Sequence, residues 1–315
     1  MQIVILDKVT TTVTDDIDFS AFGNLGEVVI YDNLTTEDEI IEATKQATII
    51  VLNKVVLDAK LLSKLSSSVK LIAITATGYD NVDVKFANQL GISVCNTPGY
   101  GTDAVAQLAI MLILSCSSQL VPQLYYLRTN GWNKQAGLSI PMQEVAGKTL
   151  GILGLGEIGG ATAKLALAFG MKVIAYNRTP KTIDGVKIVS LDELARESDF
   201  ISLSSALSAD NYKIINAEFL SQMKPTAYLI NTARGGLVDE DALIEALQNK
   251  QIAGAALDVL AQEPPLPSNP LLKMKNVILT PHIGWAPLEA RQRCIDITVG
   301  NIKNFINDQP SNLIN

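Results

Sequence analysis

Three side chains suited to acid–base chemistry stand far apart in this sequence, each behind a short apolar run typical of a buried strand: Arg234, Glu263 and His282. An arginine stays charged and offers a planar, two-pronged match to a carboxylate. An imidazole titrates near neutral pH, and a carboxylate beside it favours its protonated form. His282 is the only histidine among 315 residues. The three residues therefore predict proton transfer to a substrate that carries a carboxylate.

Each of these residues also has an ordinary explanation. Arg234 could form a surface ion pair, Glu263 could be a solvated charge before two prolines, and His282 could be packed at a strand end. A lone histidine is more often packed or exposed than catalytic. Their joint occurrence in this order, behind successive strands, favours the catalytic interpretation.

A glycine-rich turn predicts a dinucleotide-binding site. An apolar run at 150–153 leads into Gly-x-Gly-x-x-Gly and then into a helical pattern at 160–169. Gly154 would allow the tight turn, Gly156 the close approach of a pyrophosphate, and Gly159 the packing of helix on strand. Three spaced glycines alone could be an ordinary turn, but the strand–turn–helix context favours dinucleotide binding. The predicted phosphate-binding residues are Gly154, Leu155, Gly156, Glu157, Ile158 and Gly159.

The residues after the next strand indicate which dinucleotide is bound. An NAD-binding loop normally has Asp or Glu near position 177 to accept from the ribose 2′-hydroxyl, whereas this chain has Asn177. Arg178, Thr179 and Lys181 offer donors and positive charge where a 2′-phosphate would lie. We therefore expect NADP(H) to be preferred, with NAD(H) possible. In the alternative, Arg178 is a solvated surface residue and Asn177 binds an unphosphorylated ribose.

The order of elements predicts an α/β fold with parallel sheets, because strand-like runs that alternate with helical patterns are typical of βαβ units. The runs cover residues 3–6, 28–31, 49–52, 71–75, 93–95, 150–153, 173–176, 187–189, 200–203, 227–230, 255–259 and 277–279. Residues 101–120 have the pattern of an apolar helix that must be buried, and 122–144, with its glycines and prolines, predicts a loop-rich connection. Residues 286–307 predict an amphipathic helix that needs a sheet formed elsewhere in the chain.

Composition limits the classes of partner. With 48% apolar residues, the chain can bury a sizeable core, and its length favours two domains. A net charge of −7 argues against nucleic acid or an anionic membrane, since no basic cluster would neutralise phosphates. Cys95, Cys116 and Cys294 are too far apart to suggest a disulfide framework or a zinc site, so we expect no metal. The first residues enter a strand pattern without a signal peptide and no apolar run could span a bilayer, which predicts a cytoplasmic protein.

Residues 231–240, 256–265 and 280–282, together with the glycine turn, closely resemble the D-isomer-specific 2-hydroxyacid dehydrogenases over essentially the whole chain. The resemblance implies that Arg234 binds the substrate carboxylate and polarises the 2-oxo group. It implies that His282 protonates the carbonyl oxygen during reduction and that Glu263 orients the imidazole.

The family also implies a domain arrangement with two Rossmann-like domains. A flavodoxin-like substrate-binding domain would comprise residues 1–99 and 285–315, and an NAD(P)-binding domain residues 100–284. The active site would lie in the cleft, closed by hinge motion near residues 98–99 and 283–284. A segment at about 101–145 would pair two subunits into a homodimer.

Further site residues follow from the same resemblance. Besides the glycine turn and positions 177–179, the cofactor contacts would be Thr102, Ser205, Ala206, Ser208, Thr232, Ala233, Arg234, Asp258, His282 and Gly284. Thr102 would lie near the phosphates and Asp258 on the nicotinamide carboxamide. The substrate contacts would be Asn53, Thr77, Gly78, Tyr79, Arg234, His282 and Trp285. The chain departs from the family at residues 204–208, where Ser-Ser-Ala-Leu-Ser replaces His-x-Pro-Leu-Thr, and at Gln107, which replaces a usual Glu.

The branch of glycerate dehydrogenases and hydroxypyruvate or glyoxylate reductases is suggested by residues 53–57, 76–79 and 282–285. Tyr79 and Trp285 would wall a small pocket that favours glyoxylate or hydroxypyruvate over bulky 2-oxo acids, unless both aromatic rings serve core packing. Another small 2-hydroxy acid such as D-lactate is an alternative substrate. A dinucleotide-sensing corepressor on the same fold is an alternative function. A formate dehydrogenase fits poorly, because that chemistry pairs the histidine with Gln rather than Glu263.

Overall fold

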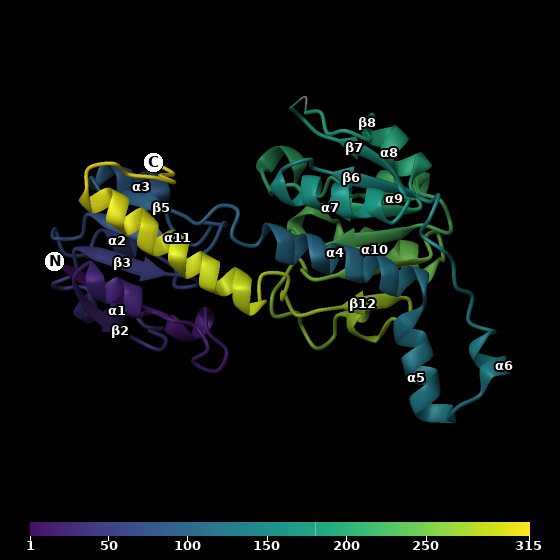
Figure 1. Ribbon diagram of the computed structural model, residues 1–315, viewed down its shortest axis with the longest axis horizontal. Helices are drawn as coiled ribbons and strands as arrows, with labels where there is room; N and C mark the ends of the chain where they lie inside the picture. Colours follow the sequence, from purple (N-terminus) through teal and green to yellow (C-terminus); the bar gives the residue numbers. More distant parts are fainter. Residues whose placement is uncertain (180) are drawn as a thin grey trace. The chain divides into compact units, whose positions relative to one another are not determined.

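The computed structural model describes residues 1–179 and 181–315, and these divide into two compact units. The first unit comprises residues 1–101 and 285–315, and the second comprises residues 102–284. Each unit is built on one parallel sheet with helices in its crossovers (Figure 1). The predicted α/β class with two parallel sheets is confirmed.

The first unit contains a five-stranded parallel sheet in the order β2-β1-β3-β4-β5, the strand order of flavodoxin. Its strands are β1 (Gln2–Ile5), β2 (Glu27–Ile30), β3 (Ile49–Leu52), β4 (Leu71–Ile74) and β5 (Ser93–Cys95). Its helices are α1 (Glu37–Ala43), α2 (Ala59–Leu62), α3 (Val84–Gln89) and α11 (Leu288–Ile306), with 3-10 turns at Lys8–Thr10 and Ser20–Asn24. The central strands β3 and β4 are buried at every position, as expected of a sheet covered on both faces.

The final helix, α11, supplies one face of that first core. Ile295 and Ile302 lie on α11 and pack in one cluster with Phe22 and with residues of β1, β3 and β4. The sequence pattern required a sheet formed elsewhere in the chain for this helix, and the sheet of residues 1–101 fills that role. Residues from the two ends of the chain therefore share one core.

The second unit contains a seven-stranded parallel sheet in the order β12-β11-β10-β9-β6-β7-β8. Its strands are β6 (Thr149–Leu153), β7 (Lys172–Tyr176), β8 (Val186–Ile188), β9 (Phe200–Leu203), β10 (Tyr228–Asn231), β11 (Gly254–Leu257) and β12 (Val277–Leu279). Its helices are α4 (Thr102–Ser117), α5 (Leu120–Asn130), α6 (Lys134–Gly137), α7 (Glu157–Ala168), α8 (Leu191–Glu197), α9 (Ala217–Gln222) and α10 (Glu240–Gln248). Short 3-10 turns cover Ala209–Asn211, Gly235–Leu237 and Pro270–Lys273. The strand order reverses between β6 and β9, where doubly wound sheets bind ligands at the carboxyl edge.

Three helices of the second unit differ from expectation. The apolar helix α4 is buried as predicted and packs against α7. Residues 122–144 are not loop-rich throughout, because α5 runs through Pro122 and α6 follows it. Pro122 is the third residue of α5, where an N–H has no partner within the helix and a proline is tolerated. The helix α7 begins at Glu157 rather than at residue 160, so the glycine motif includes its first turn.

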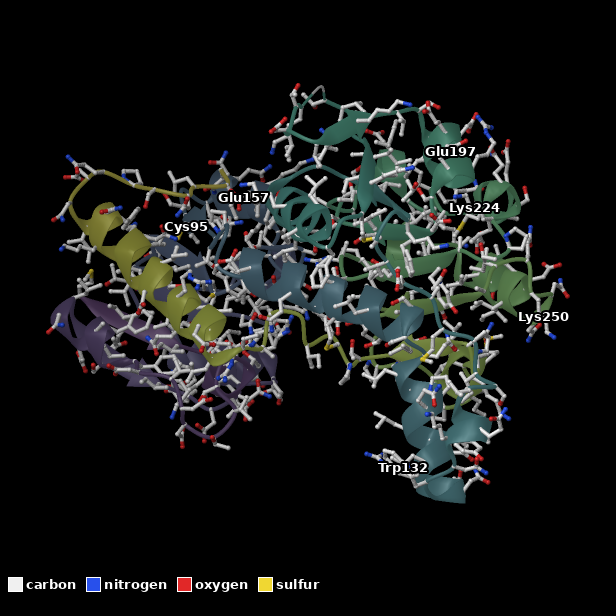
Figure 2. All side chains as sticks on the ribbon, turned by 45° about the vertical axis from the view of Figure 1, so that its right-hand side comes forward. Cys95, Trp132, Glu157, Glu197, Lys224 and Lys250 are labelled. Atoms are coloured by element: carbon white, nitrogen blue, oxygen red, sulfur yellow. The ribbon has the colours of Figure 1, made fainter. Side chains whose placement is uncertain are left out.

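The helices α5 and α6 form an arm that extends away from the sheet of their own unit (Figure 1). No residue of α5 is buried. Trp132, labelled in Figure 2, lies between the two helices and is 89% exposed. Among the described residues, no single helix has the length and apolar content to cross a membrane. The helices α4 and α5 have that length and apolar content only when taken together, and a bend of 57° separates them.

Candidate active site

The predicted catalytic residues of the second unit follow three neighbouring strands. The strands β10, β11 and β12 are adjacent and parallel, so their carboxyl ends meet at one edge of the sheet. Arg234 stands three residues after β10, and His282 stands three residues after β12. Glu263 lies in the long loop that follows β11. The fold therefore brings all three segments to the same edge.

Glu263 and His282 form a direct pair. Glu263 Oε2 lies 2.6 Å from His282 Nδ1, and Glu263 Oε1 accepts a hydrogen bond from the backbone N–H of Leu260 at 3.1 Å. The side chains are only 32% exposed for His282 and 37% for Glu263. An ionised carboxylate accepts from Nδ1–H, which fixes the ring orientation and directs Nε2 away from the pair. Nε2 is thus the ring nitrogen positioned to move a proton.

The backbone of His282 has a left-handed conformation, with φ of 54°, that L-residues seldom adopt. Asp258, only 2% exposed, holds it there from the end of β11. Its carboxylate accepts from Thr280 Oγ1 at 2.5 Å and from the N–H groups of Ile283 at 2.9 Å and Gly284 at 2.8 Å. The backbone oxygen of Asp258 also accepts from the N–H of His282 at 2.8 Å. One residue therefore binds the turn on both sides of the histidine.

Arg234 occupies a turn that is fixed by the last residue of β10. Asn231 Nδ2 donates to the backbone oxygen of Arg234 at 2.9 Å, and Asn231 Oδ1 accepts from the N–H of Ala233 at 3.0 Å. The next residue, Gly235, must be small, since a Cβ there would stand 2.0 Å from the backbone carbonyl of Leu260. The Arg234 turn and the loop of Glu263 are therefore in backbone contact.

The glycine turn has the geometry that a dinucleotide phosphate requires. Gly154 has a φ of 98°, and a Cβ there would lie 2.7 Å from the backbone nitrogen of Ser205. A Cβ on Gly159 would lie 2.1 Å from the carbonyl oxygen of Gly154. The helix therefore packs against the end of the strand more closely than any residue with a side chain would allow. Gly156 is the N-cap of α7, and among the described residues nothing lies within 4 Å of where its Cβ would stand. A pyrophosphate fits this open cradle, because first-turn N–H groups lack partners within the helix.

Two buried hydroxyl groups that follow β9 and β10 also suit a polar ligand. Ser204 Oγ and Thr232 Oγ1 are shielded from solvent and have no hydrogen-bond partner within the described chain. They follow β9 and β10, and Ser204 stands beside the glycine turn. Buried hydroxyls without partners are uncommon and call for an explanation such as a bound ligand. The residues present therefore fit a dinucleotide.

Residues 204–211, which include the departure from the expected His-x-Pro-Leu-Thr motif at 204–208, contain a serine and asparagine network. Asn211 Oδ1 accepts from the N–H of Ser208 at 2.7 Å, and Asn211 Nδ2 donates to the oxygen of Ala206 at 2.8 Å and to Ser205 Oγ at 3.1 Å. The loop is thus organised by its own side chains without the proline.

The predicted ribose-binding residues have partners in the structure. Asn177 Oδ1 accepts from the N–H of Leu155 at 2.9 Å, which links the end of β7 to the glycine turn. Arg178 Nη1 donates to Asp210 at 3.0 Å, and both side chains are more than three-quarters exposed. Thr102 and Glu157 begin the packed helices α4 and α7, and Thr102 Oγ1 donates to Glu157 Oε2 at 3.4 Å. Thr179 lies beside Arg178, and its backbone oxygen accepts from Asn177 Nδ2.

The remaining predicted substrate residues belong to the first unit. Asn53 follows β3 at the point where the strand order of that sheet reverses, and its side chain donates to the oxygen of Thr10 at 2.9 Å. The buried Asp7 carboxylate accepts from the N–H groups of Asn53, Lys54 and Val55, at distances of 2.6–3.1 Å. Loops at such a reversal point commonly contact ligands.

The loop after β4 is joined to this first loop. Asn81 Nδ2 donates to the oxygens of Asn53 and Val55 at 3.2 and 2.8 Å. Thr77 Oγ1 donates to the oxygen of Thr97 at 3.0 Å, and Gly78 and Tyr79 follow it. Tyr79 is 43% exposed, which does not fit the core-packing alternative for that ring, whereas Trp285 is half-buried in its unit.

Several residues that shape these sites were not expected from the sequence. The side chains of Asp7, Thr280 and Asn211 each form hydrogen bonds that hold a segment with predicted site residues. Thr280 is next but one to His282, and a hydroxyl there is a signal that could have been noticed. Asp7 contacts residues 53–55, and no local pattern announces such a contact.

The three cysteines are free and buried. Burial raises the pKa of the Cys95, Cys116 and Cys294 thiols to about 12. Over residues 1–179 and 181–315, no group of three His, Cys, Asp or Glu side chains could hold a metal ion.

Comparisons with known proteins agree with this geometry. The family model of the D-isomer specific 2-hydroxyacid dehydrogenase NAD binding domain matches residues 110–284. A hydroxypyruvate reductase of Blautia hydrogenotrophica is 37% identical over 100% of both chains. A glyoxylate reductase of Thermococcus litoralis is 44% identical and covers 78% of this chain and 77% of its own length. The solved structure of an acyclic imino acid reductase in complex with NADPH and D-Arg matches 100% of both chains, with a TM-score of 0.91 at 31% identity. The chain belongs to the D-isomer specific 2-hydroxyacid dehydrogenases, in the branch that includes hydroxypyruvate and glyoxylate reductases.

Proposed function

We propose that this dehydrogenase reduces glyoxylate and hydroxypyruvate to glycolate and D-glycerate with a nicotinamide dinucleotide. The observation that carries the proposal is the 2.6 Å contact between Glu263 and His282, at the sheet edge where the Arg234 turn also lies. The names of the hydroxypyruvate and glyoxylate reductases among its relatives support the choice of substrates.

The roles of the three residues follow from their chemistry. Arg234 binds the substrate carboxylate through its guanidinium, which stays charged at any working pH. Glu263 keeps a proton on His282 Nδ1, and His282 Nε2 delivers its proton to the 2-oxo oxygen. The bound dinucleotide supplies the hydride. Asp258 keeps the imidazole in place through the 280–284 turn.

Substrate contacts from the first unit would limit substrate size. Asn53, Thr77 and Gly78 lie on two loops that Asn81 joins, and we assign the substrate-binding role to this unit. Tyr79 and Trp285 supply the aromatic walls that favour a short substrate over a branched one.

The preferred dinucleotide is NADP(H). No carboxylate stands at position 177, and Arg178 offers a guanidinium beside it for a 2′-phosphate. The NADPH in the related imino acid reductase supports this preference. Asp210, which pairs with Arg178, would have to release that guanidinium to the phosphate.

The arm of α5 and α6 joins two copies of the chain into a homodimer. Its exposed apolar side chains are Leu120, Val121, Leu124, Tyr125, Leu127, Trp132 and Leu138. Exposed large apolar side chains that gather on one arm are typical of a protein interface. Trp132→Ala combined with Tyr125→Glu should shift the mass measured by light scattering from two chains to one, whereas an unchanged mass would contradict this assignment.

A panel of 2-oxo acids tests the proposed activity. Oxidation of NADPH and NADH is followed with glyoxylate, hydroxypyruvate, pyruvate and 2-oxoisocaproate. We expect the highest kcat/KM with the first two and with NADPH. His282→Ala should abolish turnover while dinucleotide binding, measured by fluorescence, persists. Faster turnover of the branched acid would refute the substrate assignment, and appreciable turnover by the His282 variant would refute its role.

A further inference from the structure

The loop that carries Glu263 is largely exposed, yet its key carboxylate is held within 2.6 Å of an imidazole. This loop runs from Leu260 to Asn269. Residues 261–264 and 266–268 are exposed, so the loop gains little from burial in the core. Its shape must therefore depend on specific polar contacts.

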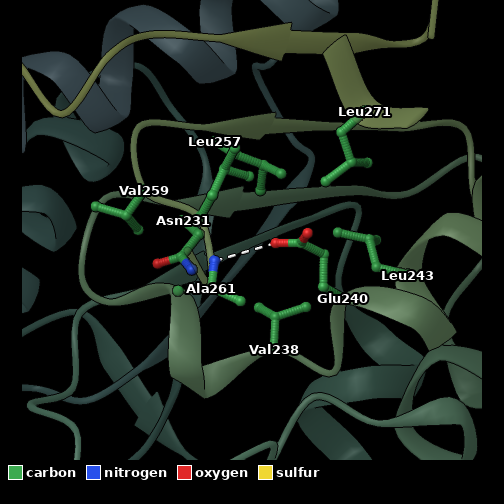
Figure 3. Close-up of a pocket in the computed structure, with 10 residues that line it drawn as sticks. Asn231, Val238, Glu240, Leu243, Leu257, Val259, Ala261 and Leu271 are labelled. Carbon is green, nitrogen blue, oxygen red and sulfur yellow. Dashed lines mark hydrogen bonds between the residues drawn. The ribbon is translucent and has the colours of Figure 1, made fainter. Parts of the chain in front are cut away.

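A second glutamate, Glu240, makes such contacts at both ends of the loop. Glu240 Oε2 accepts from the N–H of Ala261 at 3.0 Å, and Glu240 Oε1 accepts from Asn269 Nδ2 at 2.7 Å. Figure 3 shows the Glu240 side chain directed at Ala261 across a small pocket lined by Val238, Leu243 and Leu271. Glu240 is the first residue of α10, so its backbone is fixed by a regular element. Hydrogen bonds to an ionised group are stronger than neutral ones.

The contact with Asn269 has a defined direction. Asn269 Oδ1 already accepts from the N–H of Leu271 at 3.0 Å, where Asn269 caps a 3-10 turn. Its amide group is therefore turned so that Nδ2 faces Glu240. This arrangement closes the loop at its far end, while the bond to Ala261 fixes it two residues before Glu263.

We propose that Glu240 is a positioning residue for catalysis: by accepting hydrogen bonds from Ala261 and Asn269, it holds Glu263 against His282. The proposal rests on the proposed function for its kinetic consequences. The orientation of the imidazole is a property of the chain itself, and it can be measured without substrate or cofactor.

The polarity of the Glu240–Asn269 contact can be reversed by substitution. In E240Q, the new amide Nε2 faces Asn269 Nδ2, so two donors oppose each other. In N269D, two carboxylates face each other while the cap on Leu271 is kept. In the double variant, Gln Nε2 donates to the Asp carboxylate and Gln Oε1 accepts from Ala261. All hydrogen bonds of this contact are then satisfied again. If the double variant recovers the wild-type behaviour, the effects of the single variants come from this contact and not from a general loss of folding.

The single histidine provides the readout. In protein without a histidine tag, the ring carbon–proton signal in an NMR spectrum comes from His282 alone. At fixed pH and without cofactor, we expect E240Q and N269D to move this signal and the double variant to return it toward the wild-type position. With substrate, each single variant should lower kcat about tenfold, with the KM for the dinucleotide changed less than about twofold, and the double variant should recover to within about threefold of wild type.

Glu245→Gln is the matched control, because Glu245 is exposed on the same helix and loses the same charge. It should leave both readouts unchanged. If E240Q fails to fold, N269D carries the same test, because it keeps the cap on Leu271 and changes only the contact with Glu240. An unmoved His282 signal with unchanged kcat in E240Q and N269D, even at a lower Tm, would overturn the proposal. Absence of turnover in the wild type would instead refute the proposed function and leave the NMR test intact.

Discussion

Replacing Thr280 by valine should release the turn that presents His282. Thr280 Oγ1 lies 2.5 Å from the carboxylate of Asp258, and valine has the shape of threonine without the hydroxyl. A hydrogen bond to a charged group contributes about 1.5–3 kcal/mol, and its loss leaves a buried acceptor short of one partner. The left-handed backbone of His282 costs about 1–2 kcal/mol. If the turn is weakened, the backbone of His282 can therefore lower its free energy by leaving this conformation.

The magnitude can be isolated with a matched pair of variants. Thr280→Ser keeps the hydroxyl and loses one methyl group, which costs about 0.8 kcal/mol if it is buried. The loss of stability from threonine to valine then reports the hydrogen bond, at about 2 kcal/mol, and the serine variant reports the methyl group alone. That free energy corresponds to about 30-fold in an equilibrium constant, which sets the upper limit on the fall in kcat. In thermal unfolding it corresponds to about 4–8 °C in Tm for a unit of this size.

Steady-state kinetics with saturating dinucleotide and differential scanning calorimetry measure the two effects. We expect kcat of the valine variant to fall about tenfold or more below that of the serine variant, with a smaller change in the KM for the 2-oxo acid. Equal kcat and equal Tm for the two variants would refute the reasoning, because the Thr280 hydroxyl would then contribute nothing to the turn.

Three further outcomes are expected. Asp210→Asn frees Arg178 from its pair and should raise the ratio of kcat/KM for NADPH over NADH about threefold; a lower ratio would contradict the assignment of Arg178 to the 2′-phosphate. Hydrogen bonding to Arg291 lowers the pKa of the Asp16 carboxyl in the folded protein. The stability that this pair contributes to the fold is therefore fully present above the ordinary aspartate pKa, and it is lost as the pH falls toward the lowered pKa of the folded state. Asp16→Asn should therefore lower Tm more at pH 7 than at pH 2, and equal losses would count against the pair. The three buried thiols, whose pKa values are raised to about 12, should resist a thiol reagent at pH 8 until the protein is unfolded by guanidinium, and rapid reaction in the native state would show that they are accessible.

Features encoded in local patterns were predictable from the sequence. The apolar runs marked the strands to within one or two residues, because strands buried on both faces require continuous apolar side chains. The glycine spacing located the turn after β6, where Gly154 and Gly159 have no room for a Cβ. The fold then places Arg234, Glu263 and His282 at one edge because parallel strands end on the same side.

Features that depend on distant contacts were not predictable. The helix α5 was missed because Pro122 and the later glycines suggested a loop, whereas a proline in a first turn is harmless. Asn177 was weighed only as a ribose contact, yet its side chain accepts from Leu155, a residue 22 positions away. The contacts of Asp7 with residues 53–55 and of Glu240 with Asn269 join segments whose spacing follows no repeat.

The close approach at Gly235 has a consequence for recombination among related enzymes. Because a Cβ at this position would stand 2.0 Å from the carbonyl of Leu260, the path of the 260–269 loop is matched to the turn that presents Arg234. A chimera whose crossover falls between these two segments would combine a turn and a loop that were never selected together. Functional chimeras should therefore inherit residues 231–269 as one block from a single parent.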